Sequence, residues 1–200
     1  MTDIIWPAPV ILTDTAVTLA PLTQDHAVDL TLAAADGDLW RLWYTMIPHP
    51  DQVSAEIDRR LGLQAKGTML PFAILTPEGR AVGMTTYMNI DAGNRRLEIG
   101  STWYAQSVQR GPMNTQAKCL LLGHAFETLG CNAVEFRTHF MNHQSRAAIE
   151  RLGAKLDGVL RSHMVMADGS LRDTCVYSIL AHEWPAVRNN LTWKLERPRG

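Results

Sequence analysis

A glycine-containing loop at residues 109–115 is the clearest candidate ligand site in this sequence. It reads Gln109-Arg110-Gly111-Pro112-Met113-Asn114-Thr115 and joins a strand-like run, 97–104, to a predicted amphipathic helix, 116–129. The first backbone N–H groups of a helix have no partner in the chain, and with the helix dipole they can bind a phosphate. The loop could hold the diphosphate of a cofactor, although Pro112 removes one donor. Alternatively, Gly111-Pro112 is only a tight turn, with Pro112 at the first helical position.

Histidine and cysteine offer less chemistry. His139 and His143 have the i, i+4 spacing of a zinc-binding helix, but the Glu of the HExxH pattern is missing. Asn142 lies between them where a strand gives way to a helix, so no metal site is expected. The chain has three cysteines, Cys119, Cys131 and Cys175, and they form no CxxC pair. The odd number and the spacing indicate reduced thiols in a cytoplasmic protein.

Length and composition narrow the class of protein. The chain has 200 residues, 46% hydrophobic and 20% charged, which suits one globular domain with a proper core. The formal net charge is −1 and no basic stripe is present, so nucleic acid is not an expected partner. The N-terminal sequence does not resemble a signal peptide, and no apolar run approaches 18 residues, so no membrane association is expected.

The periodicity of apolar residues predicts alternating strands and helices. Strands are expected at 17–20, 70–76, 81–90, 96–104, 133–138, 155–166 and 171–180. Helices are expected from Thr23 or Asp25 to 35, at 52–65, 115–129 and 142–152. The tail after Pro185 either forms a short helix or packs across the domain. The strand–helix–strand unit over 97–138 predicts one parallel pair in an otherwise antiparallel sheet. The fold class is therefore mixed α/β, with helices on both faces of the sheet.

Four short motifs occur in one order between about residues 15 and 180. They are Leu97-Glu98-Ile99-Gly100, the loop and helix start at 109–118, Asn142-His143-Gln144-Ser145, and Arg151-Leu152-Gly153-Ala154. Each alone is common, but together they resemble the GNAT family of acetyl-CoA-dependent N-acetyltransferases, closest to its RimJ/RimL-like branch. The resemblance implies one acetyltransferase domain over residues 1–200, a parallel pair formed by the fourth and fifth strands, acetyl-CoA as cosubstrate, and a homodimer.

The resemblance also implies where the cosubstrate binds. The fourth strand should splay from the fifth and admit the pantetheine arm, whose amides would pair with backbone near the end of the fourth strand. The diphosphate would rest on the loop N–H groups, with Arg110 as a charged donor. Asn142 could cap its helix, bind the pantetheine, or both. The predicted cofactor-binding residues are Trp103, Tyr104, Gln109, Arg110, Gly111, Met113, Asn114, Thr115, Asn142 and Ser145.

Glu98 and Ser145 are the predicted catalytic residues. Acyl transfer needs a neutral amine, and a carboxylate at Glu98 could accept the amine proton directly or through water. Alternatively, Glu98 is a solvent-facing carboxylate paired with Arg95 or Arg96. Many family members protonate the leaving thiolate with a tyrosine, but that position is Ile149 here, which leaves Ser145.

No acyl-enzyme is expected, because the cysteines lack a readable His and acidic partner. The tetrahedral oxyanion should be held by a backbone N–H of the fourth strand. The acceptor is expected to be a peptide or small-molecule amine, and a protein N-terminus, an amino acid, a polyamine and an antibiotic all stay open. It should bind at the first two helices and the segment 40–44, whose aromatic residues could also be a lid on the core. Glu98 with Asp91 or Asp38 could make this cleft acidic.

Two alternative functions stay open. One is an acyl-CoA-binding sensor without turnover, favoured by Pro112 and Ile149, and the other is transfer of a longer acyl chain.

Overall fold

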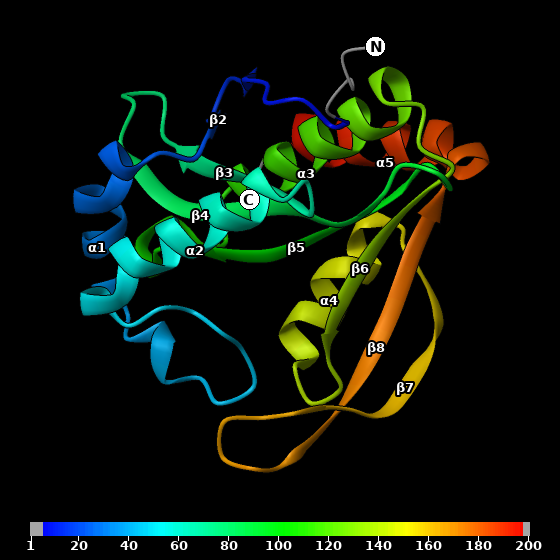
Figure 1. Cartoon of the computed structure of the whole chain (residues 1–200). Coiled ribbons are helices and arrows are strands. Elements are labelled where there is room, and N and C mark those ends of the chain that lie inside the picture. The colour runs from blue at the N-terminus through cyan, green and yellow to red at the C-terminus, as the bar shows by residue number, and fades with distance from the viewer. Residues whose placement is uncertain (1–5, 198–200) are drawn as a thin grey trace.

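One mixed sheet organises the computed structural model, which describes residues 6–197 (Figure 1). The eight strands of the described part follow the order β1-β2-β3-β4-β5-β6-β8-β7. They are β1 (Leu12–Asp14), β2 (Val17–Pro21), β3 (Met69–Leu75), β4 (Ala81–Asp91), β5 (Arg96–Tyr104), β6 (Ala133–His139), β7 (Lys155–Val165) and β8 (Leu171–Leu180). The α-helices are α1 (Ala27–Ala35), α2 (Val53–Ala65), α3 (Met113–Gly123), α4 (His143–Leu152) and α5 (Trp184–Glu196).

Strand pairing confirms the predicted sheet type. β5 and β6 are parallel, and every other neighbouring pair in the described sheet is antiparallel. The expected numbering of the parallel pair is wrong by one, because β1 precedes the strand that the sequence predicts as the first. β1 has only 3 residues, too few to show an alternating pattern. The predicted fourth and fifth strands are therefore β5 and β6.

Helices cover both faces of the sheet, as predicted. Successive residues of a strand point to opposite faces, and two neighbours on β4 show which helix lies on each. Thr86 Oγ1 accepts a hydrogen bond from Arg60 of α2, whereas the hydroxyl of Tyr87 donates to the carbonyl of Leu121 on α3 at 2.6 Å. The largest buried apolar residues, among them Phe72, pack in the core between the sheet and these helices.

Two helical segments differ from the predicted pattern. The helix expected over 115–129 is α3 followed by a 5-residue π-helical segment, His124–Thr128. The tail forms α5, which packs against this segment: Trp184 Nε1 donates to Glu127 Oε1 at 2.7 Å, and its ring stacks on Phe126 with centroids 5.6 Å apart.

The described part of the chain contains no helix with the length and apolar character needed to cross a membrane. Residues 1–5, which carry most of the sequence examined for a signal peptide, and residues 198–200 lie outside the described range.

Candidate active site

β5 and β6 pair only at their first residues and then separate. The paired positions are Arg96 with Ala133, Leu97 with Val134 and Glu98 with Glu135. β5 continues to Tyr104 and β6 to His139, yet no further pair joins them within residues 6–197. The two facing backbone edges are therefore open beyond Glu98, which is the splay that the resemblance implied.

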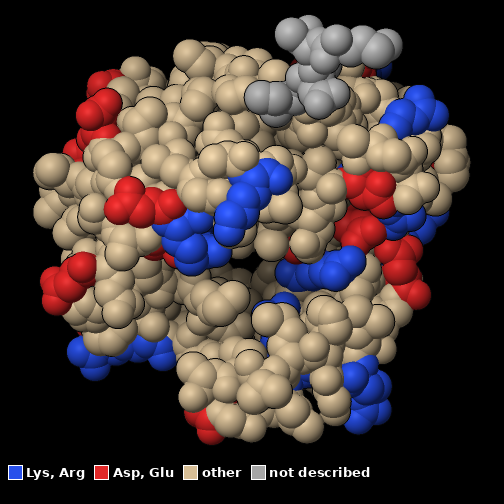
Figure 2. Space-filling view, in the orientation of Figure 1, with Lys and Arg blue, Asp and Glu red and all other residues tan. Residues whose placement is uncertain are grey.

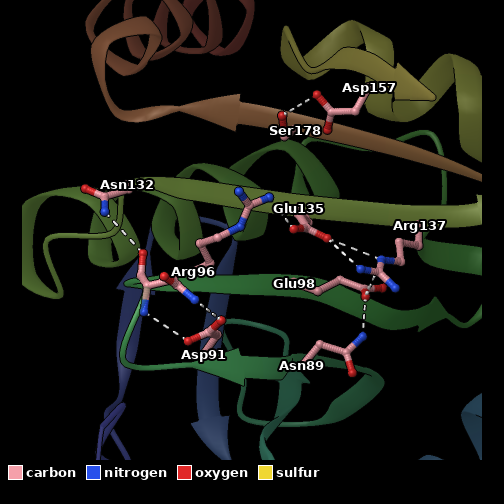
Figure 3. Close-up of polar contacts among 10 residues, drawn as sticks. Asn89, Asp91, Arg96, Glu98, Asn132, Glu135, Arg137, Asp157 and Ser178 are labelled. Carbon is pink, nitrogen blue, oxygen red and sulfur yellow. Dashed lines mark hydrogen bonds and ion pairs between the residues drawn. The ribbon is translucent and has the colours of Figure 1, made fainter.

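Glu98 lies at the point where the strands separate, with only 5% of its surface exposed. Its Oε2 accepts a 2.7 Å hydrogen bond from Asn89 Nδ2 on β4 and lies 3.5 Å from Arg137 Nε on β6 (Figure 3). Burial raises the pKa of this carboxyl group above its usual value, while the Asn89 hydrogen bond and the Arg137 charge limit the rise. Glu98 is thus a buried carboxylate held by partners from both neighbouring strands.

Glu135, opposite Glu98 in the parallel ladder, has a different environment. Its carboxylate binds Arg96, and Arg137 Nη2 lies 2.9 Å away. Burial opposes ionisation of Glu135, but the hydrogen bonds and charges of these arginines outweigh it and lower the pKa. The alternative that Glu98 is a solvent-facing partner of Arg95 or Arg96 is wrong, because Glu98 is buried and its polar partners are Asn89 and Arg137.

Asn89 and Arg137 are site residues that the sequence did not reveal. Asn89 has φ 46° and lies in an irregularity of the β4–β5 ladder, which turns its amide toward Glu98. Asparagine tolerates this left-handed conformation better than most residues. An asparagine between the apolar residues Met88 and Ile90 of a strand was the available signal. Arg137 gave no signal, because its contact depends on the pairing of β5 with β6.

Asp91 and Asp38, which could have made the cleft acidic together with Glu98, have partners within their own segments. Asp91 is bound within the turn that follows it, and Asp38 pairs with an exposed arginine of its own segment. Burial raises the pKa of Glu98, and the charges of two arginines, Arg137 and Arg172, offset part of that rise. Figure 2 shows a hollow in this face, between the part that carries α1 and α2 and the part that carries β6 and the β7–β8 hairpin, with basic side chains at its border.

A bulge at Ser101 shapes the open edge of β5. Ser101 has φ 47°, and the register with β4 shifts here. On one face, Arg60 of α2 donates from Nη2 to the carbonyl of Ser101 at 3.2 Å and from Nη1 to Thr86 Oγ1 at 2.8 Å. Arg60 is only 1% exposed, and Glu56 neutralises it through a 2.7 Å contact. The bulge is therefore fixed by a buried, paired cation.

Lys118 of α3 holds the opposite face of the same bulge. Its Nζ donates to Thr102 Oγ1 at 2.7 Å and to Thr85 Oγ1 at 3.3 Å, and the residue is 7% exposed. Burial lowers the pKa of this amine to about 7. α3 also begins at the predicted phosphate loop, so Lys118 links that loop to the bulge.

The N-terminus of α3 has no side-chain cap. Pro112 has φ −71°, and its carbonyl accepts a hydrogen bond from Gln116 N at 3.0 Å. It is the N-cap residue of α3, one position before the first helical position considered above, which Met113 occupies. A Cβ at Gly111 would meet only the carbonyl of Val108, at 3.5 Å, an ordinary contact. The fold itself does not require glycine here, and open space remains beside donors that lack a helical acceptor.

Four of the predicted cofactor-binding residues lie at the end of β5 and in the loop that follows it. Trp103 and Tyr104 are buried, and Trp103 Nε1 and Tyr104 Oη have no hydrogen-bond partner within the described range. Gln109 Nε2 donates to the carbonyl of Tyr104 at 3.1 Å, and Arg110 has φ 64°. The loop and the end of β5 are thus joined where the splay is open.

The α4 motif gives one clear assignment. Asn142 caps the helix, because its Oδ1 accepts a 2.9 Å hydrogen bond from Ser145 N. Ser145 is half-buried, and its hydroxyl makes no hydrogen bond to any described residue. No hydrogen bond joins it to Glu98 in that range, so the two predicted catalytic side chains do not form a bonded pair. Ile149 is buried in the core.

A pocket of about 240 Å³ lies between residues 43–46 and the β7–β8 hairpin. It is lined by Trp43, Thr45, Met46, Met164, Val165, Met166, Ala167, Asp168 and Arg172. The ring of Trp43 packs edge-on against His139, the last residue of β6, with centroids 5.1 Å apart. Trp43 is 56% exposed, so it lines this pocket rather than only covering the core.

Comparisons with known proteins agree with this geometry. Residues 16–155 match the family model described as an acetyltransferase (GNAT) domain. Bacillus subtilis YdaF, named provisionally as a ribosomal N-acetyltransferase, is 35% identical over 107 residues, which span 54% of this chain and 57% of YdaF. The chain thus spans little more than half the length of that relative.

Two solved structures match over most of the chain. A GCN5-related N-acetyltransferase from Brucella melitensis is 32% identical, with a TM-score of 0.85 over 94% of this chain and 86% of that one. Mycobacterium smegmatis RimJ, solved in complex with CoA-disulfide, is 26% identical, with a TM-score of 0.77 over 95% of this chain and 96% of that one. The family match, together with the likeness to YdaF and RimJ, shows that this chain belongs to the GNAT acetyltransferase family, in its RimJ/RimL-like branch.

Proposed function

We propose that this protein is an N-acetyltransferase that transfers an acetyl group from acetyl-CoA directly to a primary amine. The observation that carries the proposal is the placement of Glu98, a buried carboxylate with a raised pKa where β5 and β6 separate. A carboxylate in such a position can accept the proton that an attacking amine must lose.

The open splay and the uncapped start of α3 fit acetyl-CoA, which supplies the acetyl thioester. The free backbone edge of β5 beyond Glu98 would pair with amides of the pantetheine arm near Trp103 and Tyr104. The donors at the start of α3 suit a diphosphate. The residues that would hold it are Gly111, Met113, Asn114 and Thr115, with Gln109 and Arg110 beside them and Asn142 and Ser145 facing the arm.

Glu98 would act as the general base, directly or through one water. A primary amine is mostly protonated at neutral pH, because its pKa is about 8 for an α-amino group and above 10 for lysine. The raised pKa makes Glu98 a stronger proton acceptor than an ordinary carboxylate. Asn89 and Arg137 fix its orientation from the two neighbouring strands.

The cysteines support direct transfer rather than an acyl-enzyme. Burial raises the pKa of Cys131 to about 11 and also raises that of Cys119, so little thiolate is present at neutral pH. The developing oxyanion would be held by a backbone N–H of β5 near the bulge at Ser101. The hydroxyl of Ser145, or a water, would protonate the departing thiolate.

Release of free thiol from acetyl-CoA against a broad panel of amines tests the proposal. Glu98→Gln should reduce kcat about 10²- to 10⁴-fold, with coenzyme A binding by calorimetry unchanged. Glu78→Gln is the control, since it removes an exposed carboxylate in the turn between β3 and β4 and should leave the activity unchanged. Tight coenzyme A binding without thiol release for any amine would instead support a non-catalytic acyl-CoA sensor.

A further inference from the structure

Arg172 is a half-buried cation without an acidic partner. Its Nε donates to Thr174 Oγ1 at 3.0 Å, and no carboxylate of the described residues lies within 4.0 Å of its guanidinium. Arg172 lines the pocket described above, and its charge also acts on Glu98. A partly desolvated guanidinium usually has a charged partner, so this position suits an anionic ligand group.

The remainder of the pocket is mainly apolar and open to solvent. Four large side chains are exposed in its lining: Trp43 (56%), Met46 (74%), Met164 (39%) and Val165 (72%). Asp168, the carboxylate of this lining, already accepts two hydrogen bonds from Ser170. The pocket therefore offers an apolar wall with two charged side chains: Arg172, which forms no ion pair within the described residues, and Asp168, whose Oδ1 is occupied by Ser170.

We propose that this pocket is the acceptor subsite for a small amino acid with a free carboxylate and an apolar side chain. The carboxylate binds Arg172, the side chain packs against Met46 and Met164, and the amine is directed toward Glu98. The inference rests on the proposed function and adds the class of acceptor. The volume of about 240 Å³ is below the range typical of drug-sized ligands and suits a single amino acid.

The same charges disfavour acceptors with a second cation. Arg137 lies against Glu98, and Arg172 borders the pocket beyond it. Like charges in a partly buried site repel, so the second ammonium of a diamine would be disfavoured near Arg137 and Arg172. Asp168, which already accepts two hydrogen bonds from Ser170, is the acidic side chain of the lining.

Four acceptors of matched shape test the subsite through thiol release from acetyl-CoA. Leucine carries the carboxylate, leucinamide and 3-methylbutylamine lack it, and 1,5-diaminopentane adds a cation. We expect kcat/KM for leucine to exceed that for 3-methylbutylamine by about 10- to 100-fold, the usual range for a hydrogen-bonded charge. Leucine should also exceed alanine by about fourfold for each added carbon that is buried.

Two variants assign the effect to the arginine. Arg172→Gln should lower the ratio of kcat/KM for leucine to that for 3-methylbutylamine by about 10- to 100-fold, because any effect of Arg172 on Glu98 acts on both amines and cancels in the ratio. Arg161→Gln is the matched control, because Arg161 lies on the same hairpin, is 81% exposed and pairs with Asp173. Its kcat/KM values should equal those of the unaltered protein.

The outcomes separate this inference from the proposed function. Equal kcat/KM for leucine and 3-methylbutylamine, or a peptide with N-terminal leucine that outperforms free leucine, would overturn the subsite while the acetyltransferase stands. Calorimetry of leucine with the coenzyme A complex gives a readout without turnover. Binding that Arg172→Gln abolishes, with no thiol release from any amine, would support the subsite and reject the proposed reaction. Undetectable leucine binding in the unaltered protein, together with no turnover of leucine, would reject the subsite.

Discussion

Replacing Lys118 by methionine is expected to flatten the dependence of folding stability on pH above neutrality. In the folded protein the amine lies under the bulge of β5, bonded only to the hydroxyls of Thr85 and Thr102, and burial lowers its pKa from 10.5 to about 7. In the unfolded chain the amine is exposed to water and keeps its ordinary pKa. Between pH 7 and 10.5 the unfolded chain therefore holds more protons than the folded one.

The sign and size of the pH effect on stability follow from this difference in bound protons. Where the unfolded state binds more protons, the free energy of unfolding rises with pH, by at most about 1.4 kcal/mol per pH unit for one group. For pKa values of about 7 and 10.5, stability should rise by about 2 kcal/mol between pH 7 and pH 9. The buried lysine destabilises the fold most below pH 7, and this penalty disappears as pH approaches the unfolded pKa.

Urea denaturation at pH 7, 8 and 9 measures the effect as the difference between the unaltered protein and Lys118→Met. Taking the difference in free energy of unfolding between the two proteins cancels the contribution of all other titrating groups. The hydrogen bonds lost to Thr85 and Thr102 shift that difference at every pH but do not change its slope against pH. Lys66→Met, at an exposed lysine, is the control and should keep the full slope. Parallel stability curves for the unaltered protein and Lys118→Met over this range would show that the amine is not desolvated as described.

Three further predictions concern the site. Gly111→Val should weaken coenzyme A binding about tenfold or more in calorimetry, because the valine side chain fills the space beside the α3 donors. Pro112→Gly should leave binding intact or modestly tighter. Normal binding by the valine variant would show that the loop is only a turn. Asn142→Ala should lower the free energy of unfolding by about 1 kcal/mol; unchanged coenzyme A affinity would confine Asn142 to capping. Asn89→Ala removes a hydrogen bond that stabilises the Glu98 carboxylate, so the ascending limb of kcat/KM against pH should move about one to two units higher, and an unmoved limb would exclude Glu98 as the titrating base.

Local pattern was enough to predict most elements of the fold. β4 and β5 were predictable because long strands bounded by turn residues leave a clear pattern, and α4 because Asn142 and Gly153 mark its ends. β1 was missed because three residues carry no period, and its position depends on pairing with β2. The π-helical segment after α3 packs against α5, and no local pattern records that long-range contact.

The candidate site was only partly predictable, for a similar reason. Glu98 and the phosphate loop belong to local motifs and could be named from the sequence. Arg60 and Lys118 are long charged residues on amphipathic helices, which normally reach solvent, and only the assembled sheet shows them buried against the bulge. Arg137 reaches Glu98 only because β5 and β6 pair in one particular register.

The separation of β5 from β6 also affects how the molecule can deform. Seven residue pairs join β6 to β8 along its whole length, and β5 remains paired with β4 through its bulge, but only three pairs join the two halves of the sheet. The described sheet thus consists of two continuously paired parts, β1–β5 and β6–β8–β7, joined by three residue pairs next to Glu98. Unpaired strand edges usually occur at the outside of a sheet and are a liability there. In this protein they lie in the interior, so a ligand that supplied the missing hydrogen bonds would close the sheet and stiffen it across its middle.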